Sequence, residues 1–232
     1  MKPNITLAET KTPNGARMTL VGHDGHFCIR VNGQQLMHSA VTTSELELGS
    51  LGCERLKGKK ASPRVLIGGL GLGFTLKRVL ETVGPAAVVH VAELFPEIVA
   101  WNRTHLHRLN GALLTDPRVT LFEEDVRAVI RRAARAPYDA IMLDIDNGTT
   151  AMVSDDNNEL YSLGGIQHIA AALKPDGRAA VWSASPDAPL ASRLTKAGLH
   201  VTPIAARVHA TARRSAYMIY LADKSSGQPR RD

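Results

Sequence analysis

Glycines and carboxylates follow the strand-like segments of this sequence at regular intervals. The apolar run 65–67 leads directly into Gly68 and Gly69, and Gly71 and Gly73 then precede a helical pattern. Glycines at a strand exit let the backbone turn sharply and approach a nucleoside closely. The segment therefore predicts a nucleotide site, and a tight turn that binds nothing is the alternative.

Acidic residues stand at the ends of the next three strand-like segments. Glu93 comes twenty residues after Gly73, where a carboxylate can accept hydrogen bonds from both ribose hydroxyls. The pair 124–125 ends the third segment, where a carboxylate or its backbone can receive an adenine amino group, and the acidic run 144–147 ends the fourth. Open α/β sheets bind ligands at this edge. For any single acid, a helix cap or a surface salt bridge is the alternative.

Asp144 and Asp146 lie two residues apart, so on an extended strand they point to the same side. Converging carboxylates suit a cationic amine, because one carboxylate can orient the amine and accept its proton. We expect Asp144 to be the catalytic carboxylate, and Asp146 and Asn147 to bind the acceptor. A divalent-metal site or a capped strand exit is the alternative. Since no third carboxylate or histidine has firm spacing, we expect no metal.

Two aromatic residues near these acids are candidates for the pocket wall. Tyr161 follows the acidic segment and Trp182 ends the fifth strand of the main domain, so either could stack on a cation or on adenine. Core packing is the alternative for both. The histidines show no triad-like arrangement and receive no role.

The elements that must position these residues alternate between strand-like and helical patterns from Pro63 onward, as in βαβ units. Strands are expected at 64–69, 87–94, 118–125, 138–146, 177–184, 199–208 and 215–223. Helices are expected at 75–83, 96–109, 126–134, 164–173 and 188–197. No helix separates the last two strands, so a hairpin must close the sheet. The fold class is therefore α/β, with a seven-stranded, mostly parallel sheet and an antiparallel C-terminal strand; it resembles the Rossmann-like fold of class I methyltransferases.

A small β-hairpin region is expected before this domain. His-Asp-Gly and Asn-Gly turn signals separate alternating apolar residues there, and residues 43–55 have a helical pattern. We expect an N-terminal hairpin region at 1–60, a nucleoside-binding catalytic domain at 61–225 and a flexible tail at 226–232.

Composition narrows the class of protein. The chain has 232 residues, 44% of them hydrophobic, and its apolar runs are far shorter than the roughly 20 residues that cross a bilayer. No signal peptide is apparent, so we expect a cytoplasmic protein. Cys28 and Cys53 are too few for a disulfide framework or a zinc cluster.

Charge is distributed unevenly along the chain. The net charge is +6, yet residues 136–173 contain no Lys or Arg. Such an acidic segment attracts a cationic ligand, although a solvated acidic loop would look the same. Arg127, Arg131 and Arg135 have helical spacing, which is typical of a solvated face; a nucleic-acid patch is the alternative.

The chain resembles the spermidine synthase family of polyamine aminopropyltransferases, which have the methyltransferase fold and use decarboxylated S-adenosylmethionine. The resemblance lies in segments 65–81, 91–94, 124–125, 138–144, 160–162 and 173–177, and in the N-terminal hairpins. It implies a donor site formed by Gly69, Gly71, Gly73, Glu93, Leu94, Asp125 and Val126. It also implies Asp144 as the catalytic residue, with Asp146, Asn147, Tyr161 and Trp182 binding the substrate, and a homodimer.

The chain also departs from the family pattern. Leu72 replaces the aspartate that would hold the amine of the donor, and Asp146 follows Asp144 by two residues instead of three. Residues 43–45, Thr-Ser-Glu, stand where the family presents tyrosine, glutamine and glutamate to the acceptor. We expect aminopropyl transfer to an amine, with methyl transfer from S-adenosylmethionine as the alternative. A non-catalytic nucleoside- or RNA-binding protein is a further alternative.

Overall fold

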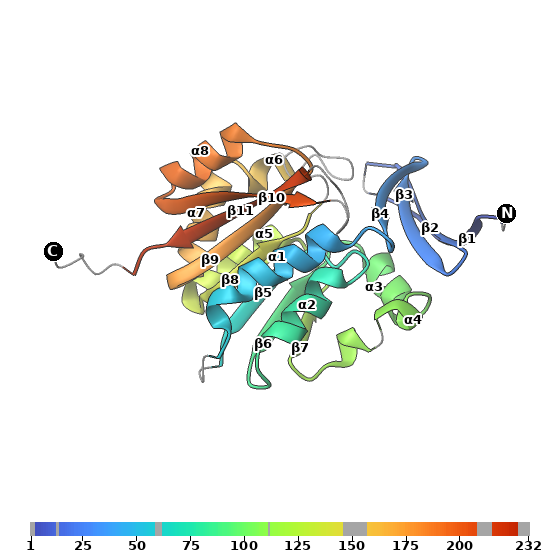
Figure 1. Ribbon diagram of the computed structural model, residues 1–232, viewed down its shortest axis with the longest axis horizontal. Coiled ribbons are helices and arrows are strands. Elements are labelled where there is room, and N and C mark those ends of the chain that lie inside the picture. Colours follow the sequence, from blue (N-terminus) through green and yellow to red (C-terminus); the bar gives the residue numbers. More distant parts are fainter. Residues whose placement is uncertain are drawn as a thin grey trace.

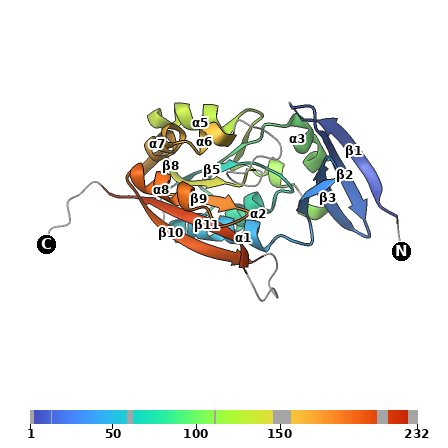
Figure 2. The same cartoon turned by 90° about the horizontal axis from the view of Figure 1, so that it is seen from above.

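Two sheets make up the computed structural model, which describes residues 3–12, 14–58, 62–110, 112–145, 157–207 and 215–226. The N-terminal sheet contains β1 (Ile5–Lys11), β2 (Arg17–His23), β3 (His26–Val31) and β4 (Gln34–His38), paired antiparallel in that order. Asp24 and Asn32 have positive φ and each precedes a glycine with positive φ, which confirms the two expected hairpin turns. Figures 1 and 2 show this sheet at one end of the molecule, beside α3 (Pro96–Arg103).

The central sheet has the strand order β10-β11-β9-β8-β5-β6-β7. Its strands are β5 (Arg64–Gly68), β6 (Val88–Ala92), β7 (Val119–Phe122), β8 (Tyr138–Leu143), β9 (Leu173–Ser183), β10 (Leu199–Arg207) and β11 (Ser215–Lys224). β11 runs antiparallel to both of its neighbours, and the pairs formed among β5 to β9 are parallel. The fold class expected from the sequence is confirmed.

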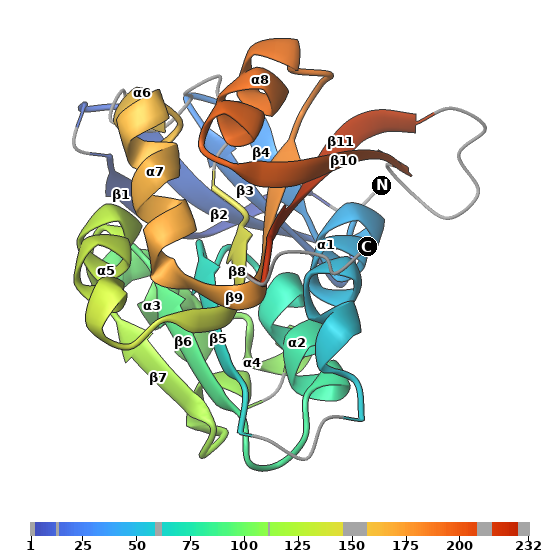
Figure 3. The same ribbon diagram turned by 90° about the vertical axis from the view of Figure 1, so that its left-hand side faces the viewer.

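Helices cover both faces of the central sheet (Figure 3). One face carries α1 (Thr43–Cys53), α2 (Phe74–Thr82), α3 and α4 (His107–Asn110). The other carries α5 (Val126–Arg132), α7 (Leu163–Ala172) and α8 (Ala188–Lys196), with the short α6 (Asn157–Leu160) before α7. Short 3₁₀ turns lie at Glu54–Leu56, Leu113–Thr115 and Ala133–Arg135. Among the described residues, no helix is long and apolar enough to cross a membrane.

Two expected boundaries are wrong. The helix expected at 96–109 is interrupted after Arg103, where the Thr104 hydroxyl donates to the Ala100 carbonyl and the Leu106 N–H donates back to Trp101. This bonding replaces the regular helical ladder. β9 begins at Leu173, earlier than expected, because its first residues already pair with Tyr138 before a register shift.

Helix α1 packs closely against two neighbours through glycines, against β8 at Gly52 and against α2 at Gly49. A Cβ atom at Gly52 would lie 2.4 Å from Met142 Sδ, and one at Gly49 would lie 2.9 Å from Arg78 Cβ. At the end of α1, the Leu51 carbonyl accepts a hydrogen bond from buried Arg178 of β9. The end of α1 is therefore held against β8 and β9. The domain limits at residues 60 and 225 stay a prediction.

Candidate active site

A cavity of about 250 Å³ lies at the carboxyl ends of the central strands. Residues after β5, β6, β7 and β8 line one side, and β4 of the N-terminal sheet lines the opposite side. The meeting of strand exits that the sequence predicted is thus observed, and the N-terminal sheet contributes directly to the cavity wall.

The glycines after β5 form one wall. Gly69 and Gly71 line the cavity with φ of 91° and 50°. A Cβ at Gly69 would lie 2.2 Å from the Asp144 carbonyl oxygen, so a side chain there collides with backbone. A Cβ at Gly71 would lie 2.5 Å from Met37 Sδ, which shows how closely β4 approaches this loop.

Gly73 lies outside the cavity lining, unlike the other two predicted glycines. It has φ of 85° and caps α2, facing Asn102 and Asn110. Its left-handed conformation is needed for the turn into the helix. Leu72, beside it, is 2% exposed and packs in the core.

Glu93 lies in the cavity wall at the exit of β6 and is buried. Its two carboxylate oxygens accept backbone N–H groups of Leu70 and Phe95, each at 2.9 Å. Burial raises the pKa of Glu93, and the backbone hydrogen bonds oppose that rise. Leu94, which follows it, is 39% exposed and also lines the cavity.

Asp125 and Val126 form the next part of the wall, at the start of α5. Asp125 caps this helix by accepting the Arg127 backbone N–H at 2.7 Å. Burial tends to raise the pKa of Asp125, but the hydrogen bonds from Arg127 outweigh it and hold this pKa below its ordinary value. Glu124, the other acid of the pair, forms hydrogen bonds with Arg132 instead.

Asp144 lines the cavity directly after β8. Its Oδ2 accepts a hydrogen bond of 2.6 Å from the Thr75 hydroxyl of α2. Burial raises the pKa of Asp144 to about 6, against a lowering effect of Thr75. Asp146 and Asn147, which were expected to bind the acceptor, lie outside the described residues.

Glu45, at the start of α1, is a cavity residue that the sequence reasoning did not select. Burial and the negative charge of Asp144 raise the pKa of Glu45 to about 7. Ser44 contributes one hydrogen bond of 2.7 Å to its carboxylate. The available signal was the Thr-Ser-Glu run at 43–45, which the family comparison placed near the acceptor.

Aromatic rings close this end of the cavity. Trp182 lines it as predicted, and its ring contacts Tyr217 with centroids 5.0 Å apart and planes tilted by 52°. The Trp182 Nε1 is buried and finds no hydrogen-bond partner in the part of the chain that the structure describes. Burial and the charge of Glu45 raise the pKa of Tyr217.

Tyr161 is a correction to the predicted pocket. It is 2% exposed and packs in the apolar cluster between the sheet and α5 and α7, while its neighbour Leu160 lines the cavity. Its ring lies among the apolar side chains of this cluster, so burial of apolar surface accounts for its position. Within the described ranges, no group of three or more His, Cys, Asp or Glu side chains could hold a metal ion.

No family model matches the chain. Two curated relatives have the same kind of name. A polyamine aminopropyltransferase of Mycobacterium tuberculosis is 33% identical over 147 residues, which cover 60% of this chain and 27% of the relative. Polyamine aminopropyltransferase 2 of Pseudomonas aeruginosa is 33% identical over 136 residues, covering 55% of this chain and 36% of that protein. The chain resembles the polyamine aminopropyltransferases.

Solved structures agree with this resemblance at the level of the fold. Spermidine synthase from Thermotoga maritima gives a TM-score of 0.71 at 16% identity, covering 95% of this chain and 73% of that one. A spermidine synthase in complex with the transition-state analogue AdoDATO gives 0.70, covering 95% and 72%. Human methyltransferase-like protein 13 in complex with SAH gives 0.58 at 18% identity, covering 81% and 82%. The methyltransferase-like fold is therefore shared with both groups.

Proposed function

We propose that this protein is a polyamine aminopropyltransferase-like enzyme. In this proposal it binds an adenosyl sulfonium co-substrate and transfers an aminopropyl group from it to an amine. The observation that carries the proposal is the pair of half-buried carboxylates, Glu45 and Asp144, in the same cavity as the glycine loop and Glu93. Buried carboxylates are costly unless a positive charge joins them, and an ammonium group supplies that charge.

We call Gly69, Gly71, Glu93 and Asp125 the nucleoside half of the cavity. In the proposal, the two glycines let the nucleoside approach the backbone, Glu93 accepts the ribose hydroxyls and Asp125 accepts the adenine amino group. Leu94 and Val126 supply apolar contact to the base. Backbone N–H groups of Leu70 and Phe95 hold the Glu93 carboxylate at the cavity wall, one on each oxygen, so its orientation toward the ribose is fixed.

We call Glu45, Asp144, Trp182 and Tyr217 the acceptor half. Here an amine nitrogen attacks the carbon attached to the sulfonium, the carbon–sulfur bond breaks, and its electron pair stays on sulfur. The nitrogen must lose a proton, and Asp144 accepts it as a general base. The raised pKa of Asp144, about 6, suits that step near neutral pH. Glu45 and the two aromatic rings orient the ammonium form, and we expect Asp146 and Asn147 to assist in binding it.

Methyl transfer from S-adenosylmethionine is the second candidate, and Leu72 favours it. The side chain at this position is packed in the core, so it offers no carboxylate to the amine of a decarboxylated donor. The fold shared with methyltransferase-like protein 13 is consistent with this alternative.

A donor and acceptor screen tests the proposal. Both labelled sulfonium donors are incubated with diamines, polyamines and amino-containing metabolites, and thermal shifts are recorded with both donors and with methylthioadenosine. Stabilisation by decarboxylated S-adenosylmethionine, together with labelled amine products, supports aminopropyl transfer. Methylated products support the alternative, and the absence of any shift with all three ligands contradicts a nucleoside site.

We also propose a homodimer. The proposal rests on the family resemblance and on the short strands of the N-terminal sheet, because a small sheet of short strands gains stability when another surface packs against it. Edge strand β1 is consistent with this, because its Ile5 is 58% exposed. Sedimentation showing only a 25.0 kDa species at micromolar concentration would contradict the dimer.

A further inference from the structure

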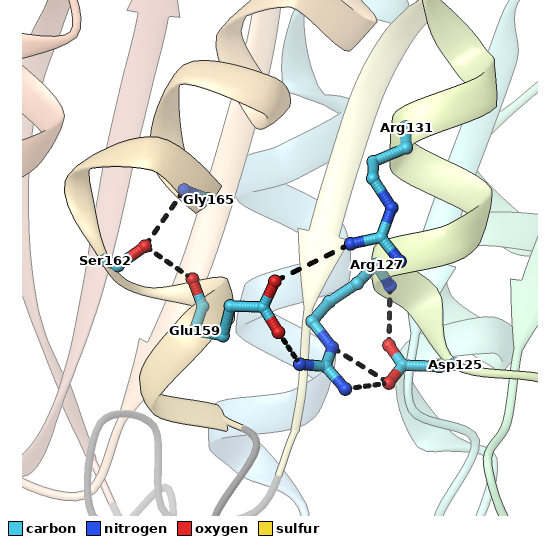
Figure 4. Close-up of polar contacts among 6 residues, drawn as sticks. All are labelled: Asp125, Arg127, Arg131, Glu159, Ser162 and Gly165. Atoms are coloured by element: carbon cyan, nitrogen blue, oxygen red, sulfur yellow. Dashed lines mark hydrogen bonds and ion pairs between the residues drawn. The ribbon is translucent and has the colours of Figure 1, made fainter.

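Arg127 lies in the cavity wall, although its helical spacing with Arg131 predicted a solvated face. Its side chain is only 16% exposed, while that of Arg131, one turn later on α5, is 49% exposed. Figure 4 shows Arg127 held between Asp125 and Glu159, with Arg131 farther along the helix. The two arginines therefore have the same charge and helix but very different surroundings.

One side of the Arg127 guanidinium holds Asp125. Nε and Nη2 both donate to Asp125 Oδ2, at 2.9 and 2.6 Å. Oδ1 accepts the Arg127 backbone N–H at 2.7 Å. A carboxylate oxygen has about two acceptor positions, so Oδ2 is filled by the guanidinium while Oδ1 keeps one position. The orientation of this carboxylate is thereby fixed, and one of its acceptor positions stays available.

The other side of Arg127 is held by α6. Nη1 of Arg127 forms an ion pair with Glu159 Oε2, and Arg131 approaches the other Glu159 oxygen at 3.8 Å. The Glu159 carbonyl accepts the Ser162 hydroxyl at 2.7 Å, and Ser162 caps α7 by accepting the Gly165 N–H at 3.1 Å (Figure 4). Glu159 is thus held through its backbone carbonyl, while its carboxylate, 65% exposed, gives Arg127 a second anionic partner beside Asp125.

We propose that Arg127 is the positioning residue for base recognition, holding Asp125 so that its remaining acceptor position meets the amino group of an adenine base. This inference rests on the proposed nucleoside site. The guanidinium balances the charge of Asp125, which lowers the cost of covering that carboxylate with a base. It also removes the rotational freedom that Asp125 would otherwise lose on binding. The preferred ligand is a purine with an exocyclic amino group.

The planar fork of arginine is needed for this task. Three guanidinium nitrogens are used, two toward Asp125 and one toward Glu159. The ammonium group of lysine is a single point and cannot reproduce this arrangement. We therefore expect Arg127→Lys to restore the charge but only part of the base preference.

Calorimetric titration with methylthioadenosine and methylthioinosine tests the proposal, because the second probe has an oxo group in place of the amino group. We expect the unmodified protein to prefer methylthioadenosine by about ten- to a hundredfold, the usual range for a hydrogen bond to a charged acceptor. In Arg127→Gln the preference should fall to within about threefold, with Arg127→Lys between the two. Arg131→Gln is the matched control and should keep most of the preference, because Arg131 reaches only Glu159, at 3.8 Å, and makes no hydrogen bond to Asp125 among the described contacts.

The helix cap survives these substitutions, because Asp125 accepts the backbone N–H of residue 127 and not only its side chain. If Arg127→Gln nevertheless fails to fold by circular dichroism, Glu159→Gln provides the second test and should reduce the preference partially. An unchanged preference in folded Arg127→Gln, or an equal loss in Arg131→Gln, overturns the role of Arg127. Failure of the unmodified protein to bind either probe overturns the nucleoside site itself.

Discussion

The two halves of the cavity satisfy their charged groups in different ways. In the nucleoside half, Glu93 accepts two backbone N–H groups and Asp125 is paired with Arg127. In the acceptor half, the Thr75 hydroxyl donates a hydrogen bond to Asp144 and the Ser44 hydroxyl donates one to Glu45. Burial raises the pKa values of Glu45, Asp144 and Glu93, whereas Arg127 holds the pKa of Asp125 below its ordinary value.

This contrast indicates that the nucleoside half binds its ligand through fixed hydrogen-bonding geometry, and that the acceptor half binds its ligand through negative charge. In the nucleoside half, the carboxylates of Glu93 and Asp125 already accept hydrogen bonds from the protein, so a ligand adds further hydrogen bonds to groups whose orientation is fixed. The acceptor half carries a carboxylate pair with little compensation, so a cation relieves an existing cost. Substitutions should therefore affect binding in the first half, and turnover, proton uptake and amine affinity in the second.

Asp144→Asn is expected to produce the largest effect. The amide keeps the shape but cannot accept the proton of the amine, so turnover should fall by about two to four orders of magnitude. Methylthioadenosine affinity should stay unchanged, because the nucleoside half is intact. Labelled product formation and calorimetry measure the two quantities. Wild-type turnover in folded Asp144→Asn would contradict the role of Asp144 as the general base.

Glu93→Ala is the corresponding change in the nucleoside half. Loss of the ribose hydrogen bonds should weaken methylthioadenosine binding by about 2 to 4 kcal/mol. Glu124→Ala is a suitable control, because that acid forms hydrogen bonds with Arg132 instead of lining the cavity. Calorimetric affinity equal to that of the unmodified protein would reject Glu93 as a ribose ligand.

The pH dependence of stability should include a contribution from Glu45 of the acceptor half, beside those of the other carboxylates whose pKa values burial raises. Burial raises the pKa of Glu45 from 4.5 to about 7, so the folded protein holds a proton that the unfolded chain releases between these values. The free energy of unfolding therefore falls as pH rises through this window. Thermal denaturation at a series of pH values should show this slope, and Glu45→Gln should flatten it. A slope that is unchanged in Glu45→Gln assigns the titration to other groups.

Binding of an amine should lower the raised pKa values of Glu45 and Asp144. An ammonium ion next to Glu45 and Asp144 favours their charged forms, so protons should leave the pair when the acceptor binds near pH 6. Calorimetry in two buffers with different ionisation enthalpies measures that release. No proton release with a bound amine would place the acceptor elsewhere in the cavity.

Trp182→Leu should give the smallest effect. A ring facing a cation contributes roughly 0.5 to 2 kcal/mol, so the KM for the amine should rise about three- to thirtyfold with little change in kcat. Tyr217→Phe keeps its ring and should change KM less. An equal rise in both variants would attribute the effect to disturbed packing between the two rings.

The nucleoside half could be predicted because its residues follow consecutive strands. Gly69, Gly71, Glu93 and Asp125 each follow a strand-like apolar run within a few residues, and parallel strands bring their carboxyl ends to one edge. Asp144 follows the same rule. Local pattern therefore placed these residues in the cavity wall, where the structure also has them. Their chemical roles stay predictions.

The acceptor half could be predicted only in part. Glu45 comes from a helix and Tyr217 from the last strand, so packing between distant segments brings them together. Arg127 resembled a solvated residue because helical spacing does not show that Asp125 and Glu159 approach it from both sides. Tyr161 is an aromatic residue next to the acidic segment, as expected for a pocket wall, but the pattern does not show that it packs in the core.

The sequence separation within each half affects when each forms during synthesis. The nucleoside half lies within residues 69–125, whereas the acceptor half extends from Glu45 to Tyr217. Contacts between distant segments form late, since long loops must close first. A growing chain can therefore assemble the nucleoside wall while Tyr217 is still unsynthesised. The carboxylate pair of Glu45 and Asp144 meets its aromatic neighbours only after β11 has joined the sheet, so the acceptor half is completed last.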